Sequence, residues 1–305
     1  MIFSRIFGWT EAQVPAPSLT LPRGHGGGKS AKRSGGGWHE RLQLVRSIPR
    51  AVVALLVLGL LSACTTAPSA PAISRDIQIP PYAKQPYQPF SRGAAVQIAL
   101  REWRAFGQKI ILSPDQPESA DSEERDEGLW QRVGDYWFQG LDYGSSESGW
   151  TGKHDAHGVE FPRGVDGDFA WSAAFIDYVM RMAGAGNRFP YAPAHSDYIN
   201  AARTRSDLAI TALPIAGYAP QLGDLICMWR ANHPVRFEDL PAGHFPGHCD
   251  IVVAQRPGSL PGTIDVIGGN VDNAVALKHV PVGPTGIVND PDYPYFVVLR
   301  VAYQM

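Results

Sequence analysis

The chain has 305 residues, of which 44% are hydrophobic and 10% aromatic, so it can bury the core of one large domain or two small ones. Residues 1–63 hold eight of the 27 Lys and Arg and two of the 29 Asp and Glu, which leaves 19 basic against 27 acidic side chains and a net charge of −8 from Cys64 onward. An acidic chain without a basic stripe argues against nucleic acid as a partner.

An apolar run of eleven residues, 51–61, follows Arg46 and Arg50 and is too short to span a bilayer. We interpret residues 46–64 as a signal peptide. The sequence Leu61-Ser62-Ala63-Cys64 resembles the lipobox of bacterial lipoproteins, in which the cysteine is lipidated and becomes the first residue after cleavage. The alternative is an ordinary secretory signal cut near Ala63. We therefore expect a lipid anchor on Cys64 and a place in the cell envelope, on the periplasmic side of the outer membrane if the source is Gram-negative.

Two segments around the signal peptide carry no pattern of a fold. Residues 1–45 contain a Gly-rich basic stretch, which indicates a translation start placed too early or a long natural extension of the signal. Residues 65–90 are rich in Pro, Ala, Gln and Tyr and are predicted to form a flexible tether. One folded domain is expected over 91–305.

The first half of this domain is predicted to be helical. One helix opens at Ser91 and ends near Gly107, a second follows near Leu129, and another runs from about 195 to 205. The central helix spans 168–184: Asp168 can cap it, Gly184 can end it, and apolar side chains recur at helical spacing. On this helix Asp177 and Arg181 are expected to face water.

Ser172 is the residue of interest on the central helix. It lies in the first turn, where free N–H groups and the positive end of the helix dipole suit a nucleophile or an oxyanion. A plain capping or surface serine is the simpler alternative for such a position.

A long polar loop, residues 140–162, precedes the central helix, and long loops in compact domains tend to be functional or disordered. Its residues His154, Asp155 and His157 could in principle ligate a metal. Adjacent loop residues seldom point at one centre and no cysteine accompanies them, so we predict no metal and no cofactor. We expect Trp150, His154 and His157 to bind substrate instead, together with Trp171 and Asp250.

The second half is predicted to be β-rich, with Pro and Gly turns between short runs. Helices followed by strands indicate an α+β fold in which the N-terminal helices pack on an antiparallel sheet. The runs expected to form strands are 223–229, 250–254, 263–267 and 295–301.

The second and third of these runs are predicted to form a hairpin about Ser259. Counting outward, His248 and Asn270 each lie eleven residues from Ser259, so they should face each other at the open end, where the amide can orient the imidazole. Asp250 shares the face of His248 and is a possible substitute orienter, while His195 is a lesser alternative base. Alternation sends Cys249 to the other face.

Cys227 and Cys249 could form a disulfide in an oxidising compartment. Two buried free thiols are the simpler expectation for this pair.

The order Ser172, His248, Asn270 resembles the nucleophile–His–Asn order of papain-like hydrolases. Three blocks are similar to those of CHAP and NlpC-type cell-wall hydrolases: Gly223-Asp224-Leu225-Ile226, Gly247-His248-Cys249-Asp250-Ile251-Val252-Val253 and Gly268-Gly269-Asn270. A fourth, Trp171-Ser172-Ala173-Ala174-Phe175, resembles their W-C-A-A-F block. The domain as a whole resembles an uncharacterised bacterial family, domain-of-unknown-function family 2272.

This resemblance implies a papain-like fold and an amidase or peptidase that cuts amide bonds in peptidoglycan, with Ser172 as nucleophile, His248 as base and Asn270 as orienter. The chain departs from those hydrolases by carrying serine where they carry the nucleophilic cysteine, and a serine must lose its proton as it attacks. The alternatives are a catalytically inactive lipoprotein that binds wall fragments or a partner protein, and a serine hydrolase of another ester or amide.

Overall fold

A computed structural model of the protein describes residues 88–114, 122–141, 145–231, 234–256 and 262–304. The expected extension, signal peptide, lipidated Cys64 and nearly all of the tether lie outside these residues, as does the tip of the predicted hairpin. Among the described helices, none has the length and apolar character needed to cross a membrane.

A seven-strand sheet forms the scaffold, in the order β1-β6-β5-β4-β3-β7-β2. Neighbouring strands run antiparallel except β1 and β6, which are parallel, so the sheet is mixed but mostly antiparallel. The strands are β1 (Ile110–Ile111), β2 (Ile210–Pro214), β3 (Leu225–Trp229), β4 (Gly247–Arg256), β5 (Gly262–Val271), β6 (Ala274–Val282) and β7 (Tyr295–Val301).

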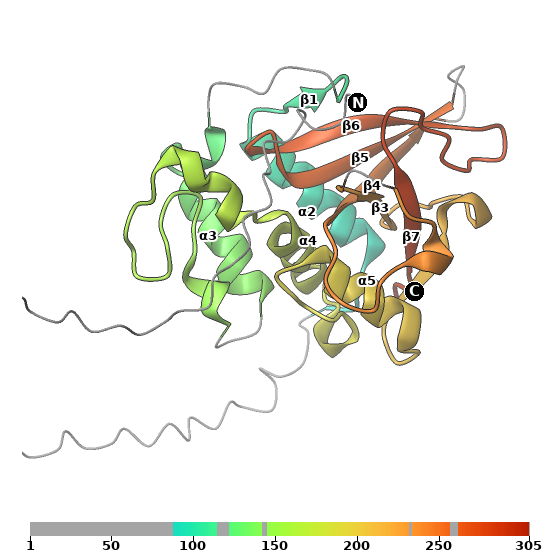
Figure 1. The fold of residues 1–305 in the computed structure, drawn as a ribbon, viewed down its shortest axis with the longest axis horizontal. Helices are drawn as coiled ribbons and strands as arrows, with labels where there is room; N and C mark the ends of the chain where they lie inside the picture. Colours follow the sequence, from blue (N-terminus) through green and yellow to red (C-terminus); the bar gives the residue numbers. More distant parts are fainter. Residues whose placement is uncertain (1–87, 115–121, 142–144, 232–233, 257–261, 305) are drawn as a thin grey trace, which may run out of the picture. The chain divides into compact units, whose positions relative to one another are not determined.

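The described α-helices precede all but the first of these strands. They are α2 (Arg92–Ala105), α3 (Leu129–Gly140), α4 (Ser172–Met182) and α5 (His195–Thr204). Short 3-10 turns connect them: η4 (Glu123–Arg125), η5 (Ser146–Gly149), η6 (Arg163–Phe169), η7 (Gly186–Arg188), η8 (Ile215–Gly217) and η9 (Phe237–Asp239). Figure 1 shows α2, α4 and α5 against the sheet, whereas α3 packs on α4. The predicted α+β class is therefore confirmed.

The central helix α4 begins later than predicted. Trp171 takes the N-cap position without a side-chain cap, and Asp168 lies in the preceding 3-10 turn η6, so the prediction that Asp168 caps the helix was wrong. Ser172 is thus the first helical residue. The prediction for the other end is confirmed, because Gly184 has a φ of +95°, a conformation that glycine adopts at low cost.

Two polar residues of α4 do not face water as predicted. Asp177 is fully buried and accepts a hydrogen bond from the Ala192 N–H at 3.0 Å. Arg181 is half-buried, donates to the Gly140 carbonyl at 3.1 Å and covers the ring of Tyr191. The helix is enclosed on more sides than its apolar stripe indicated, because α3 and the segment after α4 pack against its polar face.

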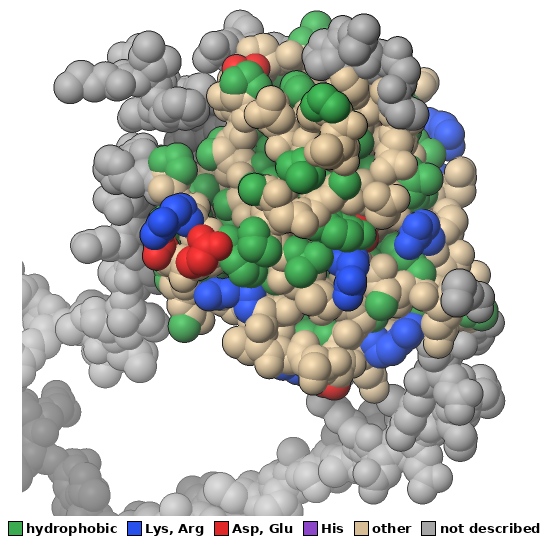
Figure 2. All heavy atoms as spheres, turned by 90° about the vertical axis from the view of Figure 1, so that its right-hand side faces the viewer, with side chains coloured by type: hydrophobic (Ala, Val, Ile, Leu, Met, Phe, Trp, Pro, Cys, Tyr) green, Lys and Arg blue, Asp and Glu red, His purple; other side chains and the backbone are tan. Residues whose placement is uncertain are grey.

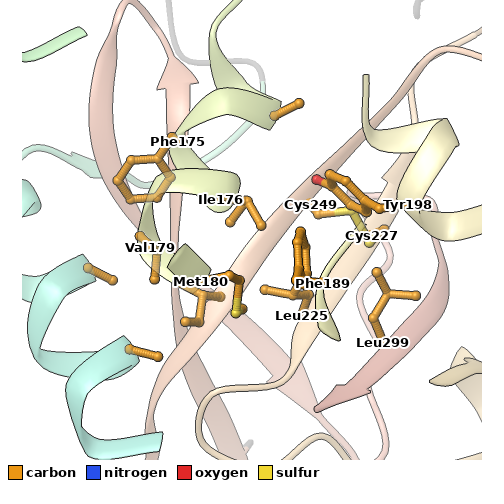
Figure 3. Close-up of a cluster of buried hydrophobic side chains, with 14 of the residues drawn as sticks. Phe175, Ile176, Val179, Met180, Phe189, Tyr198, Leu225, Cys227, Cys249 and Leu299 are labelled. Atoms are coloured by element: carbon orange, nitrogen blue, oxygen red, sulfur yellow. A yellow bond between two sulfur atoms is a disulfide. The ribbon is translucent and has the colours of Figure 1, made fainter. Parts of the chain in front are cut away.

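The main core lies between α4 and one face of the sheet. Figure 3 shows Phe175, Ile176, Val179 and Met180 of α4 gathered near Leu225 and Leu299 of β3 and β7. A second, smaller cluster covers the opposite face and contains Ile226, Val252, Ile264, Val266, Val280 and Val298. Alternate residues along the strands therefore belong to two different apolar faces of the sheet.

A disulfide joins the centre of the sheet: Cys227 of β3 and Cys249 of β4 are register partners, and their sulfurs are bonded (Figure 3). The expectation of two free thiols was therefore wrong. Two cysteines directly opposite each other on paired strands have their Cα atoms close, here 4.1 Å apart, and this proximity is what the spacing in sequence did not reveal.

The hairpin of β4 and β5 has the predicted register at its open end. Ile251 pairs with Ile267 and Val252 with Val266, which is the pairing obtained by counting outward from Ser259. The hairpin strands β4 and β5 are longer than expected, and β1, β2 and β6 were not predicted. Figure 2 shows Lys and Arg side chains distributed over the face it presents.

Candidate functional site

Ser172 lies at the N-terminus of α4 and is hydrogen-bonded to a histidine. Its Oγ is 2.7 Å from Nε2 of His195, the first residue of α5, and the two residues are only 5% and 4% exposed. The partner of Ser172 in the structure is thus the residue that sequence reasoning ranked as the lesser base. The helix start adds unpaired N–H groups and the positive end of its dipole beside the hydroxyl.

Tyr198 fixes the other side of the His195 ring. Its hydroxyl is hydrogen-bonded to Nδ1 of His195 from one turn further along α5. Burial raises the pKa of Tyr198 well above 10, so the hydroxyl keeps its proton and can either donate or accept. When Nδ1–H donates to the Tyr198 oxygen, Nε2 of His195 carries a lone pair that can accept the Ser172 proton.

His248 forms a second polar pair next to His195. The ring centroids of the two histidines are 5.3 Å apart, and Nε2 of His248 is 3.0 Å from Oδ1 of Asp250. Asp250 in turn forms an ion pair with Lys278 on β6, whose Nζ is 2.7 Å from Oδ2. The Ser172–His195 pair therefore packs, through the contact between the two imidazole rings, against a polar chain of His248, a buried carboxylate and a buried amine.

Burial is the main influence on the pKa values of the two histidines. Desolvation, and next the neighbouring His248, lower the pKa of His195 well below 6.5. Desolvation, and next Arg230, lower the pKa of His248 to about 4. Both imidazoles are consequently neutral at pH 7, the state in which an imidazole can accept a proton.

Asn270 does not take the predicted place as partner of His248. The register of β4 and β5 would set the two residues opposite each other, but β5 departs from regular pairing with β6 between Gly268 and Val271, and Asn270 has a φ of +50°. Nε2 of His248 is bonded to Asp250, and Nδ1 has no hydrogen-bond partner among the described residues. The expected Asn270–His248 bond is therefore absent from that part of the chain, and the position of orienter falls to Asp250.

Two consecutive glycines of β5 make room for the site. A Cβ on Gly268 would overlap Oδ1 of Asp250 and lie 2.7 Å from Nε2 of His248. A Cβ on Gly269 would lie 2.5 Å from Cβ of Phe175 and 2.8 Å from the Trp171 ring. The Gly268-Gly269 sequence is thus required by close approach on both faces of the strand, which gives a physical reason for the glycines in this block.

Trp171 anchors the start of α4. Its ring is buried against Phe106 and Tyr136, and its Nε1 donates to Oε2 of Glu124 at 2.5 Å. Burial raises the pKa of Glu124 to about 7, although the bond from Trp171 opposes the shift. Trp171 was predicted to bind substrate, but the structure encloses it in the core directly before Ser172, where it supports the helix start.

The loop before the central helix packs on α3 and on η6. Trp150 contacts the rings of Trp137 and Phe169, and His154 contacts Trp130 while bonding to Thr151. His157 is exposed on a turn closed by the Asp155 carboxylate. Trp150, His154 and His157 were predicted as substrate-binding residues near Ser172. The contacts found for Trp150 and His154 join them to α3, η6 and their own loop, and the bond found for His157 lies within its own turn.

Within the described ranges, no group of three or more His, Cys, Asp or Glu side chains is placed to hold a metal ion. His154 and Asp155 instead stabilise their own loop, through Thr151 and through the backbone N–H groups of His157 and Val159.

Three residues of the site were missed or underrated from the sequence. Lys278 lies in a strand that was not predicted, and Tyr198 was counted only as part of a helix. His195 was weighed, but its distance of 23 residues from Ser172 gives no periodic signal. The one available signal was the position of His195 at a helix start, the same position that drew attention to Ser172.

Fold and site together define an α+β protein with a buried Ser–His pair at the junction of two helix N-termini. Residues 124–301 match a family model described as an uncharacterized protein conserved in bacteria, DUF2272. Because the match covers more than half of the chain, the protein belongs to this family, as the sequence blocks indicated. No curated protein and no solved structure matches the chain.

Proposed function

We propose that the protein is a serine hydrolase of the amidase or peptidase type, with a papain-like fold but with His195 as the base, that acts on peptidoglycan peptides. The observation that carries the proposal is the 2.7 Å bond between Ser172 Oγ and His195 Nε2 at the first residue of α4. The choice of substrate rests on the similarity of four sequence blocks to CHAP and NlpC-type hydrolases. A lipid on Cys64 and the tether would hold the enzyme to a membrane of the cell envelope within reach of the wall.

In the proposed reaction, Ser172 Oγ attacks the carbonyl carbon of an amide as its proton moves to Nε2 of His195. The N–H groups of the first turn of α4 stabilise the negative oxygen of the tetrahedral intermediate. His195 then gives the proton to the leaving amine, and water hydrolyses the resulting ester by the same steps. His248, bonded to Asp250, supplies a second acid–base pair next to this centre.

The test is mass analysis of peptidoglycan digested by the purified protein. The wild type is expected to release peptides, and Ser172→Ala to lower the rate by about 10³-fold or more, because the nucleophile is lost. Ser172→Cys is expected to retain or gain activity, since a thiol at a helix start beside an imidazole ionises readily.

Ser146→Ala is the matched control. Ser146 is exposed in η5 and its hydroxyl bonds only the neighbouring Glu147, so this variant should digest at the wild-type rate. Unchanged activity in Ser172→Ala would remove Ser172 from the mechanism.

A second candidate is a non-catalytic lipoprotein that binds wall fragments or a partner protein. The observation in its favour is the enclosure of Ser172 and His195, which are almost inaccessible to solvent. Binding of muropeptides without turnover, together with no labelling of Ser172 by a serine-directed probe, would support this candidate against the first.

A further inference from the structure

Lys278 is a buried amine at the end of the polar chain. It lies on β6, is 2% exposed, and forms its ion pair with Asp250 across β5. The amine also lies 5.0 Å from the ring centre of Tyr293, and the hydroxyl of Tyr295 lies 3.4 Å from the same carboxylate oxygen. A lysine this deep requires a compensating charge, which Asp250 provides.

The ion pair determines the charge of Asp250. Burial alone would favour the protonated acid, but attraction from Lys278, and next from His248, outweighs burial and holds the pKa of Asp250 well below its ordinary value. The side chain is therefore a carboxylate at neutral pH. A carboxylate can only accept hydrogen bonds.

This charge settles the position of the proton on His248. The ring is neutral at pH 7 and carries one N–H, and its Nε2 faces the Asp250 carboxylate at 3.0 Å. Nε2 must be the donor, so Nδ1 carries the lone pair. Nδ1 is buried and has no hydrogen-bond partner within the described part of the chain, although the ring lies against His195.

We propose that Lys278 is a positioning residue of the Ser172 site: through Asp250 it fixes the proton of His248 on Nε2 and leaves Nδ1 as an acceptor on a ring that packs against His195. The proposal rests on the proposed function, because it gives His248 an acid–base role next to the Ser172–His195 pair. This role differs from the one expected for Asn270. Here Asp250 orients His248 from the same strand, β4, and Asp250 is held in turn by Lys278 on β6.

The tautomer of His248 can be measured directly by ¹⁵N NMR of the purified protein, with the signals assigned by comparison with His248→Gln. At pH 7 the wild type should show a protonated Nε2 and an unprotonated Nδ1. Lys278→Met should give a mixture of tautomers, because Asp250 loses the charge that keeps it ionised, and Lys278→Arg should restore the wild-type pattern.

The pH profile of peptidoglycan digestion supplies a second measurement. Without the Lys278 charge, Asp250 and His248 both bind protons more readily, so the acid limb of the Lys278→Met profile should move up by about one pH unit or more. Among the described residues, the charged and titratable groups around this pair and its lysine are Lys278 on β6, Arg230 after β3, Asp290, Tyr293 and Tyr295 before and in β7, and His195 and Tyr198 on α5.

Two further variants keep the test decisive. If Lys278→Met does not fold, the double variant Lys278→Met/Asp250→Asn removes both charges, and its amide, which can donate or accept, should allow both tautomers. Lys109→Met is the control, because it removes another ion-paired lysine, bound to Glu123 and Asp272, and should leave His248 unchanged.

The proposal would be overturned by a wild-type His248 protonated on Nδ1, or by a sole Nε2–H tautomer that persists in the double variant. These results do not depend on activity. An active Ser172→Ala variant together with the expected His248 spectra would reject the proposed function and leave the positioning role of Lys278 standing.

Discussion

At the scale of single residues, the site depends on how closely β5 approaches the His248–Asp250 pair. Gly268 fills the position beneath both side chains, and no Cβ fits there. The glycine therefore leaves the space beside β5 that the carboxylate and the imidazole occupy.

We expect Gly268→Ala to lower the free energy of unfolding by about 1 to 3 kcal/mol, because the added methyl group must displace Asp250 or the strand. Urea unfolding measures the change. Gly164→Ala is the matched control: nothing lies within 4 Å of the Cβ position at Gly164, so its effect should stay within about 0.5 kcal/mol. Equal stability of the two variants would contradict the close approach.

The sequence allowed some of these residues to be predicted and concealed others. Ser172 and His248 could be singled out because each lies at the start of a regular element, and Asp250 because it shares a face with His248. The bond from Ser172 to His195 depends on how α4 and α5 meet in space, which no local pattern encodes. The departure of Asn270 depends on an irregularity in β5, and one misplaced residue in a strand changes which side chains face each other.

At the scale of elements, the bond between η4 and α4 connects the segment before α3 to the helix that carries Ser172. Glu124 accepts from Trp171 through its side chain, and its backbone N–H donates to the Asn273 carbonyl between β5 and β6. A single buried glutamate thus joins three elements that converge near the start of α4.

Glu124 gives the stability of the protein a pH dependence. Its folded pKa of about 7 exceeds the ordinary 4.5, so between these values the folded chain keeps a proton that the unfolded chain has released. The contribution of Glu124 to the free energy of unfolding should therefore fall as the pH rises from about 4.5 to 7, by up to about 3 kcal/mol, whereas the lowered pKa values of His195 and His248 make their contributions rise with pH.

Urea unfolding of the wild type and of Glu124→Gln at a series of pH values isolates this contribution. The free energy of unfolding of the wild type relative to Glu124→Gln should fall as the pH rises, since an amide oxygen can still accept from Trp171 without titrating. Glu238→Gln, at an exposed position, should follow the wild-type profile. A constant difference between the wild type and Glu124→Gln would contradict the assignment of this pH dependence to Glu124.

The elements differ in how well the sequence predicted them. The helices α2, α3 and α4 have regular apolar spacing, and α2 has a capping serine, so their existence could be predicted. β6 was missed because its polar Lys278 and His279 interrupt an apolar run, and the ion pair that makes a buried lysine acceptable lies 28 residues away in Asp250. β2 was missed because it is a short edge strand that ends in a proline.

At the scale of the whole molecule, the proposed function joins a folded domain to a membrane anchor. The anchor is an inference from the lipobox around Cys64 and stands apart from the folded domain, so the two can be tested separately. A hydrolase of a fixed polymer gains from being held near its substrate, because tethering raises the effective concentration of the enzyme at the wall.

We expect Cys64→Ser to move the protein from the membrane fraction to the soluble fraction of a bacterial host and to abolish labelling by a radioactive fatty acid. Thr66→Ala, two residues further on, should keep both the fraction and the label. Retention of Cys64→Ser in the membrane fraction would contradict the lipid anchor.

The disulfide between Cys227 and Cys249 places a covalent bond one residue from His248. Such bonds form and persist in oxidising compartments, and reduced thiols prevail in the cytosol. A chain that folds before export would therefore build the sheet with its central strand pair held by hydrogen bonds alone. If the chain is exported, as the lipobox predicts, the oxidation state of its compartment becomes part of its maturation, because oxidation closes the β3–β4 pair that carries His248 and Asp250.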